Sequence, residues 1–218
     1  MSEQYSISPN GEKFALPKPG DYKTEFESIK KRVKAERAKG REIVVVMGVG
    51  FVGAVMAAIV ADTVDSKGKP SKFVIGMQRP SLRSFWKIPM LNRGVSPVKA
   101  EDPEVDPMIE RCVNKKKTLM ATYTYDVLKL ADIVVVDVQC DYIKEELGNV
   151  RAGQTDMAAL EASLGVIAEH IQPEALVLIE TTVAPGTTEQ VAYQIMKKTF
   201  TKRGIKSCLL YTSDAADE

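Results

Sequence analysis

The 218-residue chain has few of the residues that build disulfide frameworks or metal sites. It contains three cysteines and one histidine. Cys112, Cys140 and Cys208 show neither C-x-x-C spacing nor a neighbouring histidine, which argues against disulfide bonds and against a zinc site. We therefore expect no bound metal. His170 falls at the end of an expected helix, where we expect the imidazole to stabilise the helix dipole rather than to take part in catalysis.

Long apolar runs and strong charge are also absent. No run approaches the roughly 18 apolar residues of a membrane span, and residues 1–20 lack the basic-then-apolar layout of a secretion signal. The net charge is +1 and no dense basic patch occurs, so neither a membrane nor nucleic acid is an expected partner. With 44% hydrophobic residues, the composition predicts a globular protein with one good core, located by default in the cytoplasm.

The most informative stretch is a glycine motif between an apolar strand and an apolar helix. Residues 43–46 form a β-branched run, and after Met47 the motif Gly-x-Gly-x-x-Gly leads into a helix expected over 51–64. In this context the glycines allow a tight turn, a close approach to a pyrophosphate, and close packing of helix on sheet. The cofactor-contacting residues expected here are Gly48, Gly50, Phe51, Val52 and Gly53.

Further strands and helices alternate after this motif. Strands are expected over 72–77, 119–122, 132–138 and 176–179, with a sixth from Ile205; helices are expected over 80–92, 104–114, 125–130, 155–171 and 187–203. This alternation predicts an α/β protein with a Rossmann-type, doubly wound parallel sheet. Before it lie an irregular arm, 1–20, and an extra amphipathic helix, 21–39. We expect units 1–41, 42–207 and 208–218, and a long ligand-binding loop over 139–153.

The residues after the second strand bear on cofactor choice. An Asp or Glu at this position usually holds the ribose 2′-OH of NAD. Here the chain has Gln78 and Arg79, with Arg83 nearby. The missing carboxylate leaves NADP open beside NAD, because both arginines are possible partners for a 2′-phosphate.

The last eleven residues differ in character from the rest. Residues 208–218 resemble, residue for residue, the read-through translation of a transposon-based sequencing adapter. We expect a non-native tail; the alternative is a natural strand followed by acidic residues. Without this segment the net charge becomes +4, because +1 loses the three acids Asp214, Asp217 and Glu218.

Four segments together resemble the UDP-glucose/GDP-mannose dehydrogenase family. They are the glycine motif, the turn 91–97, the strand region 131–139 and Glu-Thr-Thr-Val-Ala-Pro-Gly-Thr-Thr at 180–188. The resemblance covers about residues 42–206 and implies the family's N-terminal NAD-binding domain. It further implies that the full-length parent oxidises the C6 alcohol of a nucleotide sugar to the acid, through a thioester on a cysteine. A homodimer or higher oligomer of that parent is expected too.

The resemblance adds contacts beyond the glycine motif. By position they are Gln78, Val138, Gln139, Cys140, Glu180, Thr181 and Thr182. The family's Thr-Pro pair is Cys140-Asp141 here, so the role of that threonine is not transferred to Cys140. The resemblance implies that most of the family's catalytic residues fall beyond this chain. We therefore expect it to be the cofactor-binding half of a truncated enzyme, and the catalytic residues stay unknown.

Two other functions stay open. One is a 6-phosphogluconate or β-hydroxyacid dehydrogenase, which starts with the same fold but would carry a glycine-rich turn near the fourth strand, where this chain has Gln139 to Tyr142. The other is a module that binds NAD(H) without catalysis.

Overall fold

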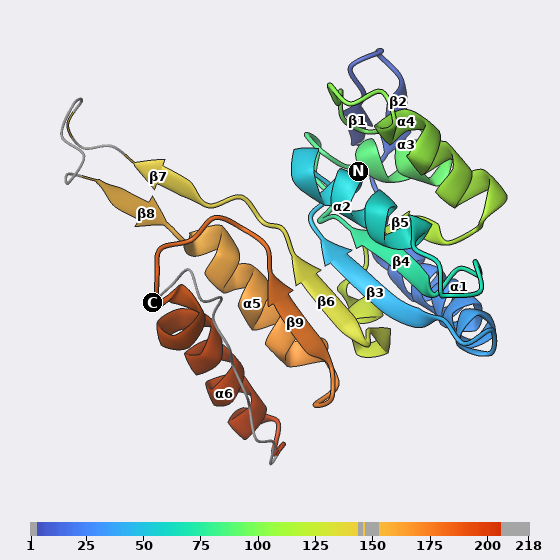
Figure 1. The fold of residues 1–218 in the computed structure, drawn as a ribbon. Coiled ribbons are helices and arrows are strands. Elements are labelled where there is room, and N and C mark those ends of the chain that lie inside the picture. The colour runs from blue at the N-terminus through green and yellow to red at the C-terminus, as the bar shows by residue number, and fades with distance from the viewer. Residues whose placement is uncertain (1–3, 144–145, 147–152, 206–218) are drawn as a thin grey trace.

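The computed structural model describes residues 4–143, 146 and 153–205. Its centre is a five-stranded parallel sheet in the order β5-β4-β3-β6-β9 (Figure 1). These strands are Leu119–Thr122, Lys72–Met77, Glu42–Met47, Ile133–Val136 and Leu176–Ile179. Counted along the chain the order is 3-2-1-4-5, which confirms the predicted doubly wound Rossmann fold. Apart from Ile205, which is not in a strand, the expected sixth strand and the segment 208–218 lie outside the described residues.

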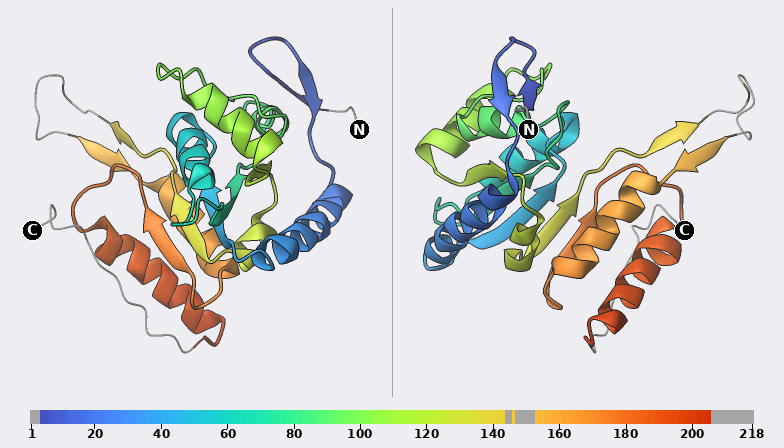
Figure 2. Two further views of the ribbon diagram at one scale, coloured as in Figure 1. Left: turned by 45° about the vertical axis from the view of Figure 1, so that its right-hand side comes forward. Right: turned by 180° about the vertical axis from the view of Figure 1, so that it is seen from behind.

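Helices cover the two faces of the sheet and make three layers (Figures 1 and 2). One face holds α1 (Pro19–Arg37), η2 (Tyr125–Leu130), α5 (Ala158–His170), η3 (Thr188–Ala192) and α6 (Tyr193–Lys202). The other holds α2 (Phe51–Asp62), α3 (Lys87–Asn92), α4 (Val105–Glu110) and η1 (Arg111–Lys115). Because both faces are covered, β3 and β4 are apolar or glycine at every position after the first, rather than alternately.

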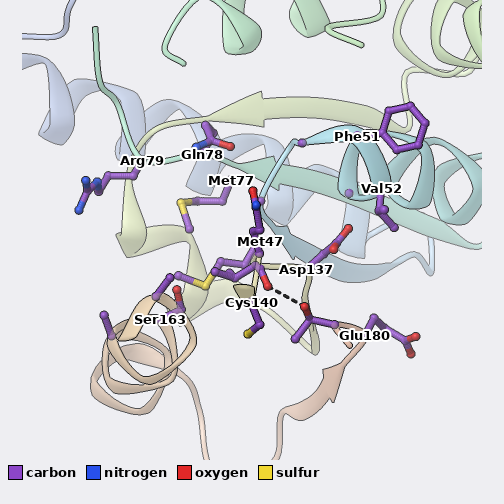
Figure 3. Close-up of a pocket in the computed structure, with 18 of the residues that line it drawn as sticks. Met47, Phe51, Val52, Met77, Gln78, Arg79, Asp137, Cys140, Ser163 and Glu180 are labelled. Atoms are coloured by element: carbon purple, nitrogen blue, oxygen red, sulfur yellow. Dashed lines mark hydrogen bonds between the residues drawn. The ribbon is translucent and has the colours of Figure 1, made fainter. Parts of the chain in front are cut away.

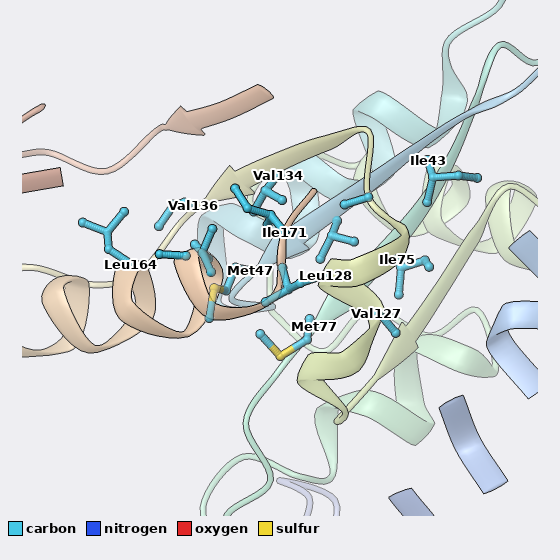
Figure 4. Close-up of a cluster of buried hydrophobic side chains, with 14 of the residues drawn as sticks. Ile43, Met47, Ile75, Met77, Val127, Leu128, Val134, Val136, Leu164 and Ile171 are labelled. Carbon is cyan, nitrogen blue, oxygen red and sulfur yellow. The ribbon is translucent and has the colours of Figure 1, made fainter. Parts of the chain in front are cut away.

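The alternation of side chains along β3 divides the core in two. Ile43 and Val45 pack under α1, η2 and α5, whereas Val44 and Val46 pack under α2. Figure 4 shows the first cluster, in which Val134 and Val136 of β6 face Leu164 of α5. The predicted amphipathic helix is also present. Ile29 and Val33 of α1 belong to this cluster, so the helix is part of the domain's flank.

Two expected irregular segments contain hairpins instead. The prediction for residues 1–20 was wrong, because β1 (Tyr5–Ile7) pairs with β2 (Lys13–Ala15). This hairpin lies against the segment before α3, where the backbone N–H of Trp86 donates to Ser6 Oγ at 3.2 Å. The predicted loop 139–153 contains β7 (Asp141–Ile143), which pairs with β8 (Gln154–Asp156) just after that loop, and the pair extends away from the sheet (Figure 1). Strands of three residues are too short to show periodicity, and their pairing partners are distant.

Some helix boundaries differ from the prediction. The helix expected over 80–92 begins only at Lys87, which places Pro89 in the first turn, where its missing N–H is tolerated. The helix expected from 155 begins at Ala158, whose N–H donates to Asp156 Oδ1 at 3.0 Å. Within the described part of the chain, none of the helices combines the length and apolar character that crossing a membrane requires.

Candidate functional site

An open cleft of about 960 Å³ lies at the carboxyl ends of the central strands (Figure 3). It spans the point between β3 and β6 where the strand order reverses, which is where open α/β sheets bind ligands. Its volume is within the range of cofactor sites. All the contact residues predicted from the sequence except Arg83 line this cleft: Gly48, Gly50, Phe51, Val52, Gly53, Gln78, Arg79, Val138, Gln139, Cys140, Glu180, Thr181 and Thr182.

The glycine turn between β3 and α2 is packed so tightly that side chains are excluded at two positions. A Cβ atom on Gly48 would lie 2.3 Å from the carbonyl oxygen of Asp137, and Gly48 has φ +104°. A Cβ on Gly53 would lie 1.8 Å from the carbonyl oxygen of Gly48. The Gly48 N–H donates to the Met77 carbonyl at 2.8 Å. The turn is therefore held against both neighbouring strands.

Gly50 differs from the other two glycines. A Cβ there would meet nothing within 4 Å, because the residue faces the open cleft. The helix α2 starts at the next residue, so the unpaired N–H groups of its first turn and its positive dipole end face the same space. Such a terminus favours an anion. The turn therefore fits the pyrophosphate of a dinucleotide.

The β4 side of the cleft carries amide and basic groups. The N–H of Val49 donates to Gln78 Oε1 at 3.1 Å, so Gln78 braces the glycine turn as well as lining the cleft. Arg79 is exposed beside it, and Arg83 is exposed outside the lining. Lys87, which was not predicted as a site residue, lines the cleft instead. Burial, followed by the nearby Arg83 charge, lowers the pKa of Lys87.

The β6 and β9 side carries two carboxylates, Asp137 and Glu180. Asp137 Oδ2 is buried, and no hydrogen-bond partner for it occurs among the described residues. Burial raises the pKa of Asp137, and the charge of Glu180 raises it further. The sequence pattern predicted Asp137 as part of a buried strand and not as a site residue. A single acid inside Ile-Val-Val-Val-Asp-Val was the available signal.

The loops after β6 and β9 contact each other at the floor of the cleft. The Thr181 hydroxyl donates to the Val138 carbonyl at 2.7 Å, which joins the two predicted loop motifs. Burial is the largest of the effects that raise the pKa of the Cys140 thiol. Because a thiol must ionise to attack, Cys140 lacks the usual activation of a nucleophile. Cys112 is fully buried away from the cleft with its pKa raised to about 11, which is typical of a packing residue.

One wall of the cleft was not predicted from the glycine and strand-end motifs. It comes from α5 and η2, and its residues are Tyr125, Ala159, Ala162, Ser163 and Val166. The α5 residues recur at helical spacing and are mainly small or apolar, so this wall offers a smooth surface for a planar group. Helical periodicity alone could not separate this face from the core-facing stripe of Leu160 and Leu164.

Comparisons with known proteins agree with the resemblance. The sequence profile of the UDP-glucose/GDP-mannose dehydrogenase family, NAD binding domain, matches residues 42–213. UDP-N-acetyl-D-mannosamine dehydrogenase of Pyrococcus horikoshii is 28% identical over 162 residues, which are 74% of this chain and 34% of that protein.

Solved structures show the same relationship. NDP-N-acetyl-D-galactosaminuronic acid dehydrogenase from Methanosarcina mazei Go1 is 30% identical with a TM-score of 0.63, over 78% of this chain and 33% of its own. GDP-mannose dehydrogenase from Pseudomonas aeruginosa, at 22% identity and a TM-score of 0.56 over 72% and 32% of the two chains, shares the fold. The chain spans about a third of the length of these relatives. Since the profile covers the sheet, the glycine turn and the cleft, the chain belongs to the UDP-glucose/GDP-mannose dehydrogenase family and contains its NAD binding domain.

Proposed function

We propose that the chain is the cofactor-binding part of a nucleotide-sugar dehydrogenase. The main support is the glycine turn, where the backbone leaves no space for a side chain at Gly48 or Gly53 and Gly50 faces the cleft. The full-length enzyme would oxidise the C6 alcohol of a UDP- or GDP-sugar to the acid, as a homodimer or higher oligomer. The bound cofactor supplies the hydride acceptor for that reaction.

The chain's own residues would bind and orient the dinucleotide. The first-turn amides of α2 would hold the pyrophosphate, and the β4 end of the cleft would hold the adenosine ribose. Glu180 and Asp137 lie at the other end, where the positively charged nicotinamide of the oxidised cofactor would be placed. The α5 wall would exclude water from one face of that ring.

The residues of the cleft also support the expectation that the 218 residues alone are catalytically inactive. Oxidation to the acid needs a substrate held against the nicotinamide and an activated thiolate to trap the aldehyde. Among the described residues Cys140 is the thiol that lines the cleft, and burial raises its pKa rather than lowering it. Those steps would therefore require residues of the full-length enzyme in the region of the relatives that this chain does not span.

Two measurements on the purified 218-residue protein test this function. Isothermal titration calorimetry with NADH, and with NADPH in parallel, should show one site for a reduced cofactor. Absorbance at the NADH band, with NAD or NADP and a panel of UDP- and GDP-sugars, should stay flat. Absence of binding to both cofactors would refute the cofactor site, and sustained turnover would refute the assignment of catalysis to residues beyond this chain.

A further inference from the structure

The amide of Gln78 has a defined orientation at the β4 end of the cleft. Only its carbonyl oxygen can accept the Val49 N–H, at 3.1 Å, because an amide NH2 group has no acceptor capacity. The Nε2 group is therefore left as a donor on the side away from the turn. An acidic residue in this place would accept hydrogen bonds from a ribose 2′-OH. Gln78 offers the opposite polarity at that point.

Basic side chains that have no carboxylate partner in the described part of the chain line the same cleft. Arg79 and Lys87 line the cleft and Arg83 is close enough to Lys87 to affect its charge. Among the described residues, none of the three takes part in an ion pair. The carboxylates of the cleft come from β6 and the end of β9, and Figure 3 shows Glu180 on the opposite side from Arg79. The positive charge at the β4 end is thus uncompensated.

We propose that Gln78, Arg79 and Lys87 form a subsite for the 2′-phosphate of NADP(H), which rests on the proposed dinucleotide function of the cleft. A phosphate monoester carries a charge of about −1.5 to −2 at neutral pH, and its oxygens accept hydrogen bonds. Nε2 of Gln78 and the two cations supply donors and charge, while Arg83 adds to the field from outside the lining. Burial and the charge of Arg83 lower the pKa of Lys87, which means that they disfavour its charged form. An anion bound beside Lys87 would stabilise that charged form.

Calorimetry with four ligands tests the subsite: NADP, NAD, adenosine 2′,5′-bisphosphate and adenosine 5′-monophosphate. We expect NADP to bind about tenfold more tightly than NAD, and the bisphosphate more tightly than the monophosphate by a similar factor. Tighter binding of NAD than of NADP would overturn the subsite and leave the proposed function in place. Binding of none of the four would refute the proposed function itself.

Gln78→Glu is the matched variant, since it keeps the length of the side chain and an acceptor for Val49 N–H but replaces the donor by a carboxylate. It should weaken NADP at least about tenfold and leave NAD unchanged or tighter. Arg79→Ala should weaken NADP alone. Lys67→Ala removes an equal charge from an exposed loop outside the cleft and should change neither affinity. Equal losses of NAD and NADP in Gln78→Glu would overturn the subsite by showing a general role in the turn.

Discussion

Alanine at two neighbouring glycines should separate cofactor binding from folding. Gly50 has φ −80° and ψ −156°, a conformation open to any residue, and its added Cβ would touch nothing within 4 Å. Gly53 lies inside α2, where an added Cβ would be 1.8 Å from the Gly48 oxygen and 2.9 Å from the Gly48 carbonyl carbon. The same methyl group therefore has space at one position and strikes backbone at the other.

The expected free energies of unfolding follow from these contacts. For Gly50→Ala, the weaker N-cap costs about 0.5–1 kcal/mol, and reduced freedom of the unfolded chain returns about 0.4–1 kcal/mol. The net change should stay within about 1 kcal/mol. For Gly53→Ala, the gain of about 1 kcal/mol in helix propensity is exceeded by displacement of the turn, and we expect a net loss of at least about 2 kcal/mol. In a chain of this size that loss lowers Tm by roughly 4–8 °C.

Gly50→Ala should lose cofactor affinity although it loses less stability than Gly53→Ala. The methyl group of Gly50→Ala would stand where the pyrophosphate approaches the α2 amides, so the affinity for the dinucleotide should fall by about tenfold or more. Gly50→Val should abolish binding. Urea unfolding of the ligand-free protein and calorimetry with the preferred cofactor give the two quantities. If Gly50→Ala bound the cofactor like the wild type, or lost more stability than Gly53→Ala, the assignment of the turn would be refuted.

Three further outcomes concern carboxylates. Asp137→Asn should raise stability at pH 7 without cofactor, because a raised folded pKa makes the wild type lose stability as pH rises above the ordinary value of 3.8; lower stability of the variant in urea at pH 7 would contradict this. Glu36→Ala should lower the free energy of unfolding, measured with urea, by about 3 kcal/mol, because its fully buried carboxylate pairs with three basic side chains. Glu27→Ala, at an exposed position of the same helix, should lower it by less than about 0.5 kcal/mol. Hydrogen bonds from Arg111 hold the pKa of Asp62 well below its usual range, so this pair stabilises the fold above the ordinary pKa and less as pH falls below it. Unfolding midpoints between pH 3 and 7 should show a flatter acid limb for Asp62→Asn, and an unchanged slope would count against the pair.

The sheet could be predicted because its strands are local signals. Residues 72–77 were predicted as a strand from a short apolar run between polar loops, and β4 has these bounds. The β3 run before the glycines was found in the same way. Buried parallel strands are apolar along their whole length, so each is visible in isolation. Right-handed crossovers then limit the orders in which these strands can pair.

The hairpins could not be predicted in that way. Tyr5–Ile7 and Lys13–Ala15 depend on pairing with each other and on a site before α3, where Ser6 is fully buried. Serine in an irregular-looking arm gives no local sign of such burial. The β7–β8 hairpin likewise joins residues separated by more than ten positions. In both cases the strands are only three residues long, which is too short for sequence periodicity to identify them.

Among the site residues, a similar division separates strand ends from helix faces. Gln78 was predicted because it follows the second parallel strand, where the ribose of a dinucleotide is usually held, and Thr181 was predicted from the family resemblance of the turn 180–188. Lys87 was missed because the irregular turns before α3 set its position, and no motif marks them. The sequence did show that a carboxylate is missing after β4. It did not show that the replacing amide is oriented by Val49.

The distribution of charge in the cleft gives an independent reason for the orientation proposed for the dinucleotide. Cations Arg79 and Lys87 occur at the β4 end, and the carboxyl groups of Asp137 and Glu180 occur at the β6 and β9 end. In NADP the 2′-phosphate lies at the adenosine end, the pyrophosphate lies at the centre, and the one positive group, the oxidised nicotinamide ring, lies at the other end. Binding of NADP in the reverse direction would place the 2′-phosphate beside two carboxyl groups and leave the basic end without an anion. Strand topology and electrostatics therefore favour the same proposed direction, although the first depends on backbone connectivity and the second only on side chains.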